Sequence, residues 1–359
     1  MREIIPTIQQ WQKAGKRMAL ATIIQAEGSS PRPVGSKMIV SEKGEMMGSI
    51  SGGCVESGVV EEALVCIKDH KTRIQHYGID NSNPWTVGLA CGGQIDVFIE
   101  PLFDPSQPNG FSVEILTTCI NLLEKDAPFC LCLAISPPMQ GARAILQNNR
   151  CIAGESNSEW VKRLCTTHYA NDLAETHPKT IALGLIDGSV VKVFVEPIFP
   201  QPRMIIVGAV HIAVSLTEFA KALDFKTIII DPRKAFLTHG RFPRADELVN
   251  SWPQDILPSM KISSRDCVIV LSHDEKIDVP PLKEAITSSA GYIGMLGSKK
   301  TKAVRFQSLT ELGILPARLQ KIHAPIGLDI GAVEPQEIAA SIIAEIIASR
   351  RDSFNAGKN

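Results

Sequence analysis

The chain has 359 residues, enough for two or three domains of ordinary size, and 44% of them are apolar, as in a globular protein. The formal net charge of −1 predicts no broad basic surface for nucleic acid. A run of about 18 apolar residues, which a membrane span needs, does not occur, and the N-terminus lacks the features of a secretory signal. A cytoplasmic protein without nucleic-acid or membrane contacts is therefore expected.

Nine cysteines occur, without any CxxC pair and without zinc-site spacing. A reducing cytosol disfavours a disulfide framework, so most of these cysteines are expected to be small buried apolar residues. Two of them, Cys54 in SISGGCVE and Cys91 in GLACGGQ, are flanked by glycines and are considered separately below.

Proline-rich linkers divide the chain at 104–110 and at 200–202. The predicted parts are an α+β half at 1–103, a second half at 104–199 and a third domain at 203–350. Residues 351–359 are expected to form a disordered tail.

The first two parts resemble each other. DVFIEPLF (96–103) matches KVFVEPIF (192–199), and at the same offset GLACGGQI (88–95) matches GLIDGSVV (184–191). Upstream, GSKMIVSEKGEMMG (35–48) resembles GARAILQNNRCIAG (141–154). Each copy predicts a strand, a hairpin, a helix and a last strand ending in Glu-Pro. The segment 104–199 is therefore interpreted as a degenerate second copy of the scaffold in 1–103.

This repeat offers an internal control, because features confined to one copy are candidates for function. Cys54 aligns with Trp160 and Cys91 aligns with Asp187, so the second copy keeps the scaffold and lacks both cysteines. The chemistry is accordingly expected in the first copy.

The Cys54 loop contains Gly52 and Gly53, which allow backbone conformations closed to other residues. Helical spacing begins at Val55, so Cys54 should lie at a helix N-terminus, where the dipole favours a thiolate. Bare N–H groups of the two glycines could cradle an anion such as phosphate.

Cys91 precedes Gly92 and Gly93 just before a predicted strand, which would allow close approach of a ligand. Thiolates suit soft metals and sulfur transfer. The segment GSSPRP (28–33) adds groups that suit phosphate or carboxylate oxygens: Ser29, Ser30 and Arg32. The alternative, two tight turns with buried cysteines, stays open.

The last third alternates apolar runs with helical spacing and predicts a Rossmann-like, doubly wound parallel sheet of the α/β class. The strand runs are MIIVGA (204–209), KTIIID (226–231), CVIVLS (267–272) and GYIGML (291–296). Helical stretches are expected at 211–225, 279–288, 299–312 and 334–350.

A dinucleotide fingerprint, G-x-G-x-x-G/A, is only partly present after the first of these strands. Gly208 and Ala213 fit it, but Val210 replaces the glycine that lets a pyrophosphate approach. Asp231 ends the second strand, where a ribose contact is expected. NAD(P) binding is thus indicated by Asp231 and disfavoured by Val210.

Other polar or glycine-bearing turns follow predicted strands, at the edge where such sheets bind ligands. The candidate residues are His211, His273, Gly297, Ser298 and Asp329. Each could equally be part of a capped turn.

Several long motifs in the same order resemble the XdhC/CoxI family of xanthine and carbon monoxide dehydrogenase accessory proteins. They are GSSPRPVGSKMIV, GSISGGCVE and GLACGG in the N-terminal part, and VGAVH, RFPRADE, LSHDEKID, GYIGMLGS and HAPIGLDIGA in the C-terminal part. The resemblance covers nearly the whole chain. It departs from the family at Val210, where the family usually has glycine.

The resemblance implies a maturation factor that binds molybdenum cofactor and assists its sulfuration and insertion into a xanthine-dehydrogenase-type molybdenum hydroxylase. A cysteine desulfurase is the implied sulfur donor. Cys54 and Cys91 match the family's glycine-flanked cysteines, and Gly208 and His211 match its glycine turn. Whether the cysteines ligate molybdenum, carry sulfur or only shape a phosphate loop stays open.

Two other functions remain as alternatives. One is an NAD(P)-dependent oxidoreductase that uses the C-terminal domain, and the other is an interaction scaffold without a small-molecule site. A homodimer is expected because it is the commonest oligomeric form.

Overall fold

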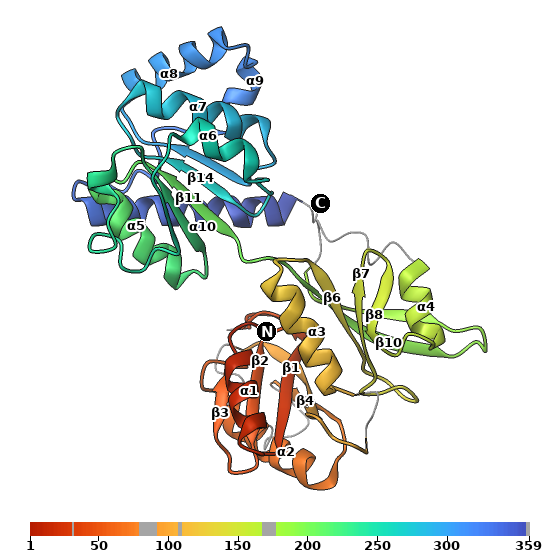
Figure 1. Cartoon of the computed structure of the whole chain (residues 1–359). Coiled ribbons are helices and arrows are strands. Elements are labelled where there is room, and N and C mark those ends of the chain that lie inside the picture. Colours follow the sequence, from red (N-terminus) through yellow and green to blue (C-terminus); the bar gives the residue numbers. More distant parts are fainter. Residues whose placement is uncertain (31, 79–91, 107–109, 167–176, 357–359) are drawn as a thin grey trace. The chain divides into compact units, whose positions relative to one another are not determined.

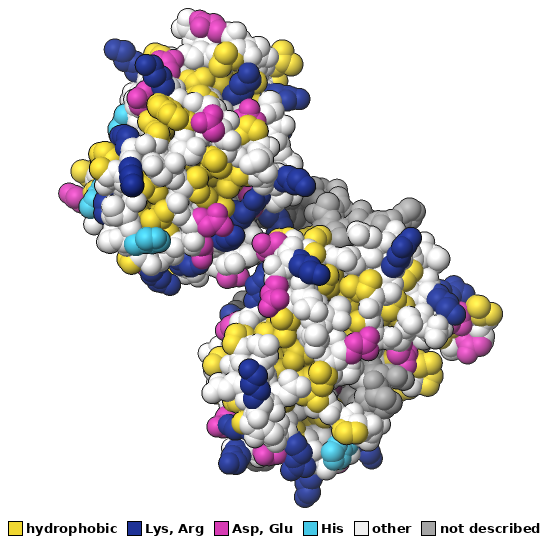
Figure 2. All heavy atoms as spheres, viewed as in Figure 1, with side chains coloured by type: hydrophobic (Ala, Val, Ile, Leu, Met, Phe, Trp, Pro, Cys, Tyr) yellow, Lys and Arg dark blue, Asp and Glu magenta, His cyan; other side chains and the backbone are white. Residues whose placement is uncertain are grey.

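The structure, a computed structural model, describes residues 1–30, 32–78, 92–106, 110–166 and 177–356 (Figure 1). The chain divides into two compact units, Met1–Pro200 and Gln201–Asn359. Among the described helices, none has the length and apolar character that a membrane span requires. On the face shown in Figure 2, Lys and Arg side chains are interspersed with Asp and Glu.

The first half of unit 1 is a five-stranded antiparallel sheet with strand order β3-β2-β1-β5-β4. Its elements are α1 (Ile5–Lys13), β1 (Met18–Glu27), β2 (Lys37–Ser41), β3 (Met46–Gly48), α2 (Glu56–Asp69), β4 (Arg73–Tyr77) and β5 (Gln94–Pro101).

The second half is another five-stranded antiparallel sheet, with the matching strand order β8-β7-β6-β10-β9. Its elements are α3 (Val113–Glu124), β6 (Phe129–Ala134), β7 (Arg143–Gln147), β8 (Arg150–Gly154), α4 (Glu159–Thr166), β9 (Lys179–Gly184) and β10 (Val190–Ile198). The same element types follow in the same order in both halves, so the predicted α+β region with an internal repeat is confirmed.

Gly48 and Gly154 show how closely the two halves correspond. Both have positive φ, +90° and +84°, at the end of the hairpin's second strand. A Cβ at Gly48 would overlap the carbonyl oxygen of Lys37, and a Cβ at Gly154 would overlap that of Arg143. Both hairpins therefore require glycine at the same place.

Each sheet of unit 1 is covered on one face by its own helix. Val59, Ala63 and Ile67 of α2 pack on the first sheet, and Trp160 and Leu164 of α4 pack on the second. The helices α1 and α3 contribute to one core that both sheets share, with Ile8, Trp11, Ile115, Leu20 and Leu131 among its buried residues. The two halves consequently form a single compact unit.

Unit 2 contains a six-stranded parallel sheet with strand order β13-β12-β11-β14-β15-β16. The strands are β11 (Arg203–Val207), β12 (Lys226–Ile230), β13 (Glu247–Val249), β14 (Cys267–Val270), β15 (Tyr292–Met295) and β16 (Ile322–His323). This is the strand order of a Rossmann fold, as predicted.

Helices cover both faces of this sheet. One core contains residues of α5 (His211–Ala222) and α10 (Pro335–Ala356), and the other contains residues of α7 (Glu275–Thr287) and α8 (Lys299–Glu311). The connections contain the short helices η2 (Lys234–Phe236), α6 (Pro253–Ile256), η3 (Leu257–Ser259) and α9 (Pro316–Leu319).

The helix α10 extends to Ala356 and so includes residues 351–356, which the sequence predicts as part of a disordered tail. Residues 336–356 contain neither glycine nor proline, so no strong helix breaker occurs before Ala356.

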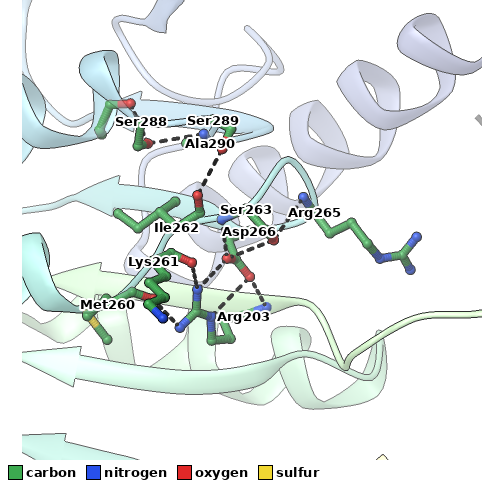
Figure 3. Close-up of polar contacts among 11 residues, drawn as sticks. Arg203, Met260, Lys261, Ile262, Ser263, Arg265, Asp266, Ser288, Ser289 and Ala290 are labelled. Carbon is green, nitrogen blue, oxygen red and sulfur yellow. Dashed lines mark hydrogen bonds and ion pairs between the residues drawn. The ribbon is translucent and has the colours of Figure 1, made fainter. Parts of the chain in front are cut away.

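Arg203 and Asp266 join two strands at the amino edge of the parallel sheet (Figure 3). The Arg203 backbone N–H donates to Asp266 Oδ1 at 2.9 Å, and Nη2 donates to Oδ2 at 2.6 Å. The guanidinium also donates to the carbonyl oxygens of Met260 and Lys261 at 2.9 Å. Burial raises the pKa of Asp266, but the hydrogen bonds from Arg203 and Ser263 outweigh burial and lower it.

Candidate functional site

Three motifs singled out in the sequence lie at one end of the first sheet. The segment GSSPRPVGSK links β1 to β2, SISGGCVE links β3 to α2, and Gly92-Gly93 leads into β5. Glu27 pairs with Gln94, and Met38 pairs with Gly48. The carboxyl ends of β1 and β3 therefore coincide with the amino ends of β2 and β5.

Gly28 and Gly93 bring two of these motifs into contact. A Cβ at Gly28, where φ is +67°, would lie 3.5 Å from Gly93 Cα. A Cβ at Gly93 would overlap the carbonyl oxygen of Ser29. Glycine at position 93 is thus required by the close approach of the Ser29 backbone, which the sequence alone does not reveal.

Glu56, at the start of α2, organises the Cys54 loop. Its Oε1 accepts hydrogen bonds from Ser51 N–H at 2.8 Å and Gly52 N–H at 2.9 Å, and its Oε2 accepts from Gly53 N–H at 2.8 Å. The hydroxyls of Ser49 and Ser51 also donate to this carboxylate. The buried Glu56 side chain thus holds the loop from inside.

The same contacts bear on the predicted anion cradle. The N–H groups of Gly52 and Gly53 are not bare, since both donate to Glu56. Burial raises the pKa of the Glu56 carboxyl, but the hydrogen bonds from Ser51, Ser49 and Gly53 outweigh burial and lower it to about 2. The loop already contains its own anion, so it offers these amides to no phosphate in this conformation.

Cys54 lies on the outside of this loop, directly before Val55, the N-cap of α2. Its backbone N–H donates to Ser51 Oγ at 2.9 Å. Among the cysteines that the structure describes, Cys54 alone is exposed. By contrast, burial raises the pKa of the Cys66 and Cys119 thiols to about 12. Cys91 lies outside the described residues, as does its distance from Cys54.

The second copy uses the equivalent positions for packing and for a turn. Trp160 is buried in the core of its half, and its Nε1 donates to Glu155 at 3.2 Å. Only residues 185–189 separate β9 from β10, whereas residues 78–93 separate β4 from β5. The Asp187 carboxylate accepts from Ser189 N–H at 2.9 Å within that short turn. Among the described cysteines, an exposed thiol therefore occurs in the first copy alone.

Arg32 borders a pocket of about 230 Å³ between the two copies, together with Lys37, Pro178 and Glu196. Its Nε is buried and has no hydrogen-bond partner among the described residues. The adjacent Ser30 hydroxyl donates to the Arg32 carbonyl oxygen at 2.8 Å, and its role as a ligand group stays a prediction. The Nε–H of Arg32 could therefore donate a hydrogen bond to an oxyanion.

The C-terminal candidates all follow parallel strands at the carboxyl edge of the sheet. His273 follows β14, Asp329 follows β16, and both are exposed, as is His211 at the start of α5. Gly297 and Ser298 follow β15, and Ser298 caps α8 by accepting from Thr301 N–H at 3.1 Å.

Gly208 follows β11 with φ +104°, and a Cβ there would lie 2.9 Å from the Ser272 nitrogen, which follows β14. These two strands are the neighbours at which the strand order reverses. Ligands of open parallel sheets bind at such a point.

Asp231, which follows β12, is fully buried and fully hydrogen-bonded. Its Oδ1 accepts from Arg233 N–H at 2.8 Å and from Arg233 Nε at 2.9 Å. Its Oδ2 accepts from Ala209 N–H at 2.7 Å and from Arg233 Nη2 at 2.8 Å. In this conformation Asp231 orients Arg233 and has no free lone pair for the expected ribose contact. Sequence reasoning missed Arg233, although a cation two residues after a strand-ending aspartate was visible.

Within the described part of the chain, no three His, Cys, Asp or Glu side chains are grouped so as to hold a metal ion. Among the described residues, Cys54 is therefore not part of such a three-residue group.

Comparison with protein families matches residues 11–78 to the XdhC and CoxI family and residues 204–346 to the XdhC Rossmann domain. The chain belongs to the XdhC and CoxI family. The predicted resemblance is confirmed.

Individual relatives match over most of their length. A protein of Bacillus subtilis described as a probable xanthine dehydrogenase subunit is 28% identical, over 92% of this chain and 93% of that protein. The molybdenum cofactor insertion chaperone PaoD of Escherichia coli is 26% identical, over 94% of this chain and 85% of that protein. A crystal structure described as a xanthine dehydrogenase from Bacillus halodurans superposes with a TM-score of 0.73 at 26% identity, covering 97% of this chain and 96% of that one.

Proposed function

We propose that this chain is a maturation factor that binds molybdenum cofactor and assists its sulfuration and insertion into a xanthine-dehydrogenase-type molybdenum hydroxylase. The likeness to an insertion chaperone over 94% of the chain supports the cofactor and the role. The observation that carries the proposal is the exposed Cys54 thiol on a loop that Glu56 holds in place.

Cys54 fits the cofactor by its chemistry. When bound, the cofactor supplies a molybdenum centre to which a sulfur ligand is added. A thiolate can ligate a soft metal or hold a sulfur atom as a persulfide. Cys54 directly precedes the N-cap of α2, so its thiol lies near the positive end of that helix dipole. Cys91 joins Cys54 in this proposal on the sequence evidence.

Arg32 is the second group that fits. Molybdopterin carries a phosphate, and a guanidinium is a strong donor to phosphate oxygens. The buried Nε of Arg32 has no partner among the described residues, and it borders a pocket at the interface of the two copies. The proposed phosphate contact thus moves from the Gly52 and Gly53 amides to Arg32.

The proposed partners are the client molybdenum hydroxylase and a cysteine desulfurase as sulfur donor. The proposed setting is the cytoplasm, and the proposed oligomer is a homodimer. The oxidoreductase alternative is weaker, because Asp231 has no free lone pair for a ribose hydroxyl and Val210 stands where a pyrophosphate would approach.

The test is retention of molybdenum cofactor by the purified chain after gel filtration, measured as bound molybdenum and pterin fluorescence. Cys54→Ala and Cys91→Ala should each release cofactor, and Arg32→Ala should weaken retention. Cys165→Ala is a matched control, because Cys165 is a half-buried thiol of the second copy. Retention by both cysteine variants at the level of the control would contradict the role of the two thiols.

A further inference from the structure

A second, independent site is suggested by the segment that follows β12. Four cations and one carboxylate occur in residues 231–244, DPRKAFLTHGRFPR. The carboxylate, Asp231, is buried and neutralised by Arg233. The segment therefore presents a net positive charge at the carboxyl edge of the Rossmann sheet.

Arg233 is held rigidly within this segment. Asp231 accepts from its Nε and from Nη2, which uses two of the five N–H groups of a guanidinium. The Arg233 side chain is 43% exposed, and three of its N–H groups donate to neither oxygen of Asp231. A planar cation fixed by a buried carboxylate loses little conformational entropy when it binds a ligand.

Phe236 joins a second arginine to the first. The guanidinium carbon of Arg233 lies 4.5 Å from the centroid of the Phe236 ring, and that of Arg241 lies 5.5 Å from the same centroid. Arg241 Nη1 also donates to the Phe236 carbonyl oxygen at 2.7 Å. Arg233, Phe236 and Arg241 form one group, here termed the arginine cluster, whose parts hold one another in place.

We propose that the arginine cluster binds a ribonucleotide that carries a phosphomonoester on its ribose 2′-hydroxyl. In a Rossmann sheet the ribose of a bound nucleotide lies at the carboxyl end of the second strand, here β12. A free carboxylate there accepts from the 2′- and 3′-hydroxyls, whereas an arginine accommodates a 2′-phosphate. Asp231 has all four of its lone-pair sites occupied, so the donors of Arg233 and Arg241 select an anion rather than a hydroxyl.

Val210 further restricts which phosphate group of the nucleotide can contribute to binding. It is the N-cap of α5 and replaces the glycine that normally allows a 5′-phosphate group to approach the first turn. The 2′-phosphate should consequently supply most of the binding energy, and the 5′-phosphate should contribute little.

The sharpest test compares two isomers of the same charge, adenosine 2′-monophosphate and adenosine 5′-monophosphate, by calorimetry with the full chain. We expect the 2′-isomer to bind at least about tenfold more tightly, which is about 1.4 kcal/mol. Equal affinities, or no binding of the 2′-isomer at millimolar concentration, would overturn the proposal.

Variants locate the site. Arg241→Ala should weaken binding of the 2′-isomer about tenfold, and Arg233→Lys should do the same, because a lysine lacks the planar fork. Arg244→Ala is the matched control, because Arg244 lies on the same segment, pairs with Glu218 and is absent from the arginine cluster. The affinity of this variant for the 2′-isomer should stay within about twofold of the wild-type value. Val210→Gly should raise affinity for the 5′-isomer alone. An unchanged affinity in Arg241→Ala would place the phosphate elsewhere and overturn the assignment.

This inference goes beyond the proposed function, and its test contains no molybdenum cofactor. Failure of nucleotide binding would leave the cofactor retention experiment untouched. Conversely, loss of the Cys54 role would not affect the comparison of the two isomers.

Discussion

The ammonium nitrogen of Lys37 lies 2.6 Å from each carboxylate oxygen of Glu196, and the two residues belong to different sheets. Arg143 of the second sheet pairs reciprocally with Glu100 of the first, its Nε donating at 3.1 Å. Both cations open the second strand of their sheet, and both carboxylates precede the proline of the last strand. All four side chains are buried. Each copy therefore supplies one cation and one carboxylate to a two-fold-like interface.

Lys37→Met should destabilise unit 1 by about 3–5 kcal/mol, because it leaves the Glu196 carboxylate buried without its partner. Urea unfolding followed by circular dichroism measures this loss. The double variant Lys37→Met with Glu196→Met should recover most of it, since no unpaired charge remains. Arg17→Ala is the control, as its ion pair with Glu42 is exposed and should matter far less. A single variant as stable as the double one would refute this account.

Glu56→Gln should loosen the Cys54 loop and cost about 1–3 kcal/mol at neutral pH, because the loop amides lose a charged acceptor. The folded-state pKa of Glu56 is depressed from 4.5 to about 2, so its contribution is complete above about pH 4.5 and is lost as the pH falls towards 2. The stability difference between wild type and variant should shrink over that interval. A difference that is constant from pH 7 to pH 3 would contradict the hydrogen-bonding role.

Thiol labelling should separate Cys54 from the buried cysteines. Maleimide at pH 7.5 should modify Cys54 in the native protein, whereas Cys66, Cys119 and Cys267 should react only after unfolding. Burial raises the pKa of each of these three thiols to about 12. Peptide mass spectrometry reads out the sites, with labelling in denaturant as the reference. Labelling of Cys66 at the rate of Cys54 would show that the core of the first copy opens readily.

Gly208→Ala should destabilise unit 2 by about 1–3 kcal/mol, because alanine is strained at φ +104° and its Cβ would lie 2.9 Å from the Ser272 nitrogen. Gly240→Ala is a suitable control, since a Cβ at Gly240 meets nothing within 4 Å and no left-handed φ is required there. Thermal unfolding compares the two variants. Equal melting temperatures would show that the β11 turn adjusts to a side chain.

Periodicity was sufficient to predict the Rossmann sheet, because its strands are buried on both faces and appear as uninterrupted apolar runs between helical stretches. The repeat was visible for a related reason: Gly48 and Gly154, like the two Glu-Pro pairs, occupy positions where the backbone or a buried ion pair tolerates few residues. Such positions survive in both copies while the surrounding sequence diverges.

The organisation of the site was not predictable in the same way. Glu56 was visible as an acidic residue at a helix start, but the sequence does not show that its side chain turns back to the amides of the preceding loop. The pattern places Asp231 after β12, where a ribose contact is expected. Whether its carboxylate is free depends on the side-chain conformation of Arg233, which the sequence does not show. The partners of Lys37 and Arg143 are 159 and 43 residues away along the chain, beyond the reach of local patterns.

The reciprocal ion pairs also bear on how this protein could have arisen. A copy that carries both Lys37 and Glu100 would satisfy both charges if it paired with an identical chain, since each lysine would meet the glutamate of the other. Gene duplication and fusion of such a homodimer would keep the interface while freeing the two halves to evolve separately. One descendant could then specialise in chemistry at its exposed thiol, and the other could become its permanent support.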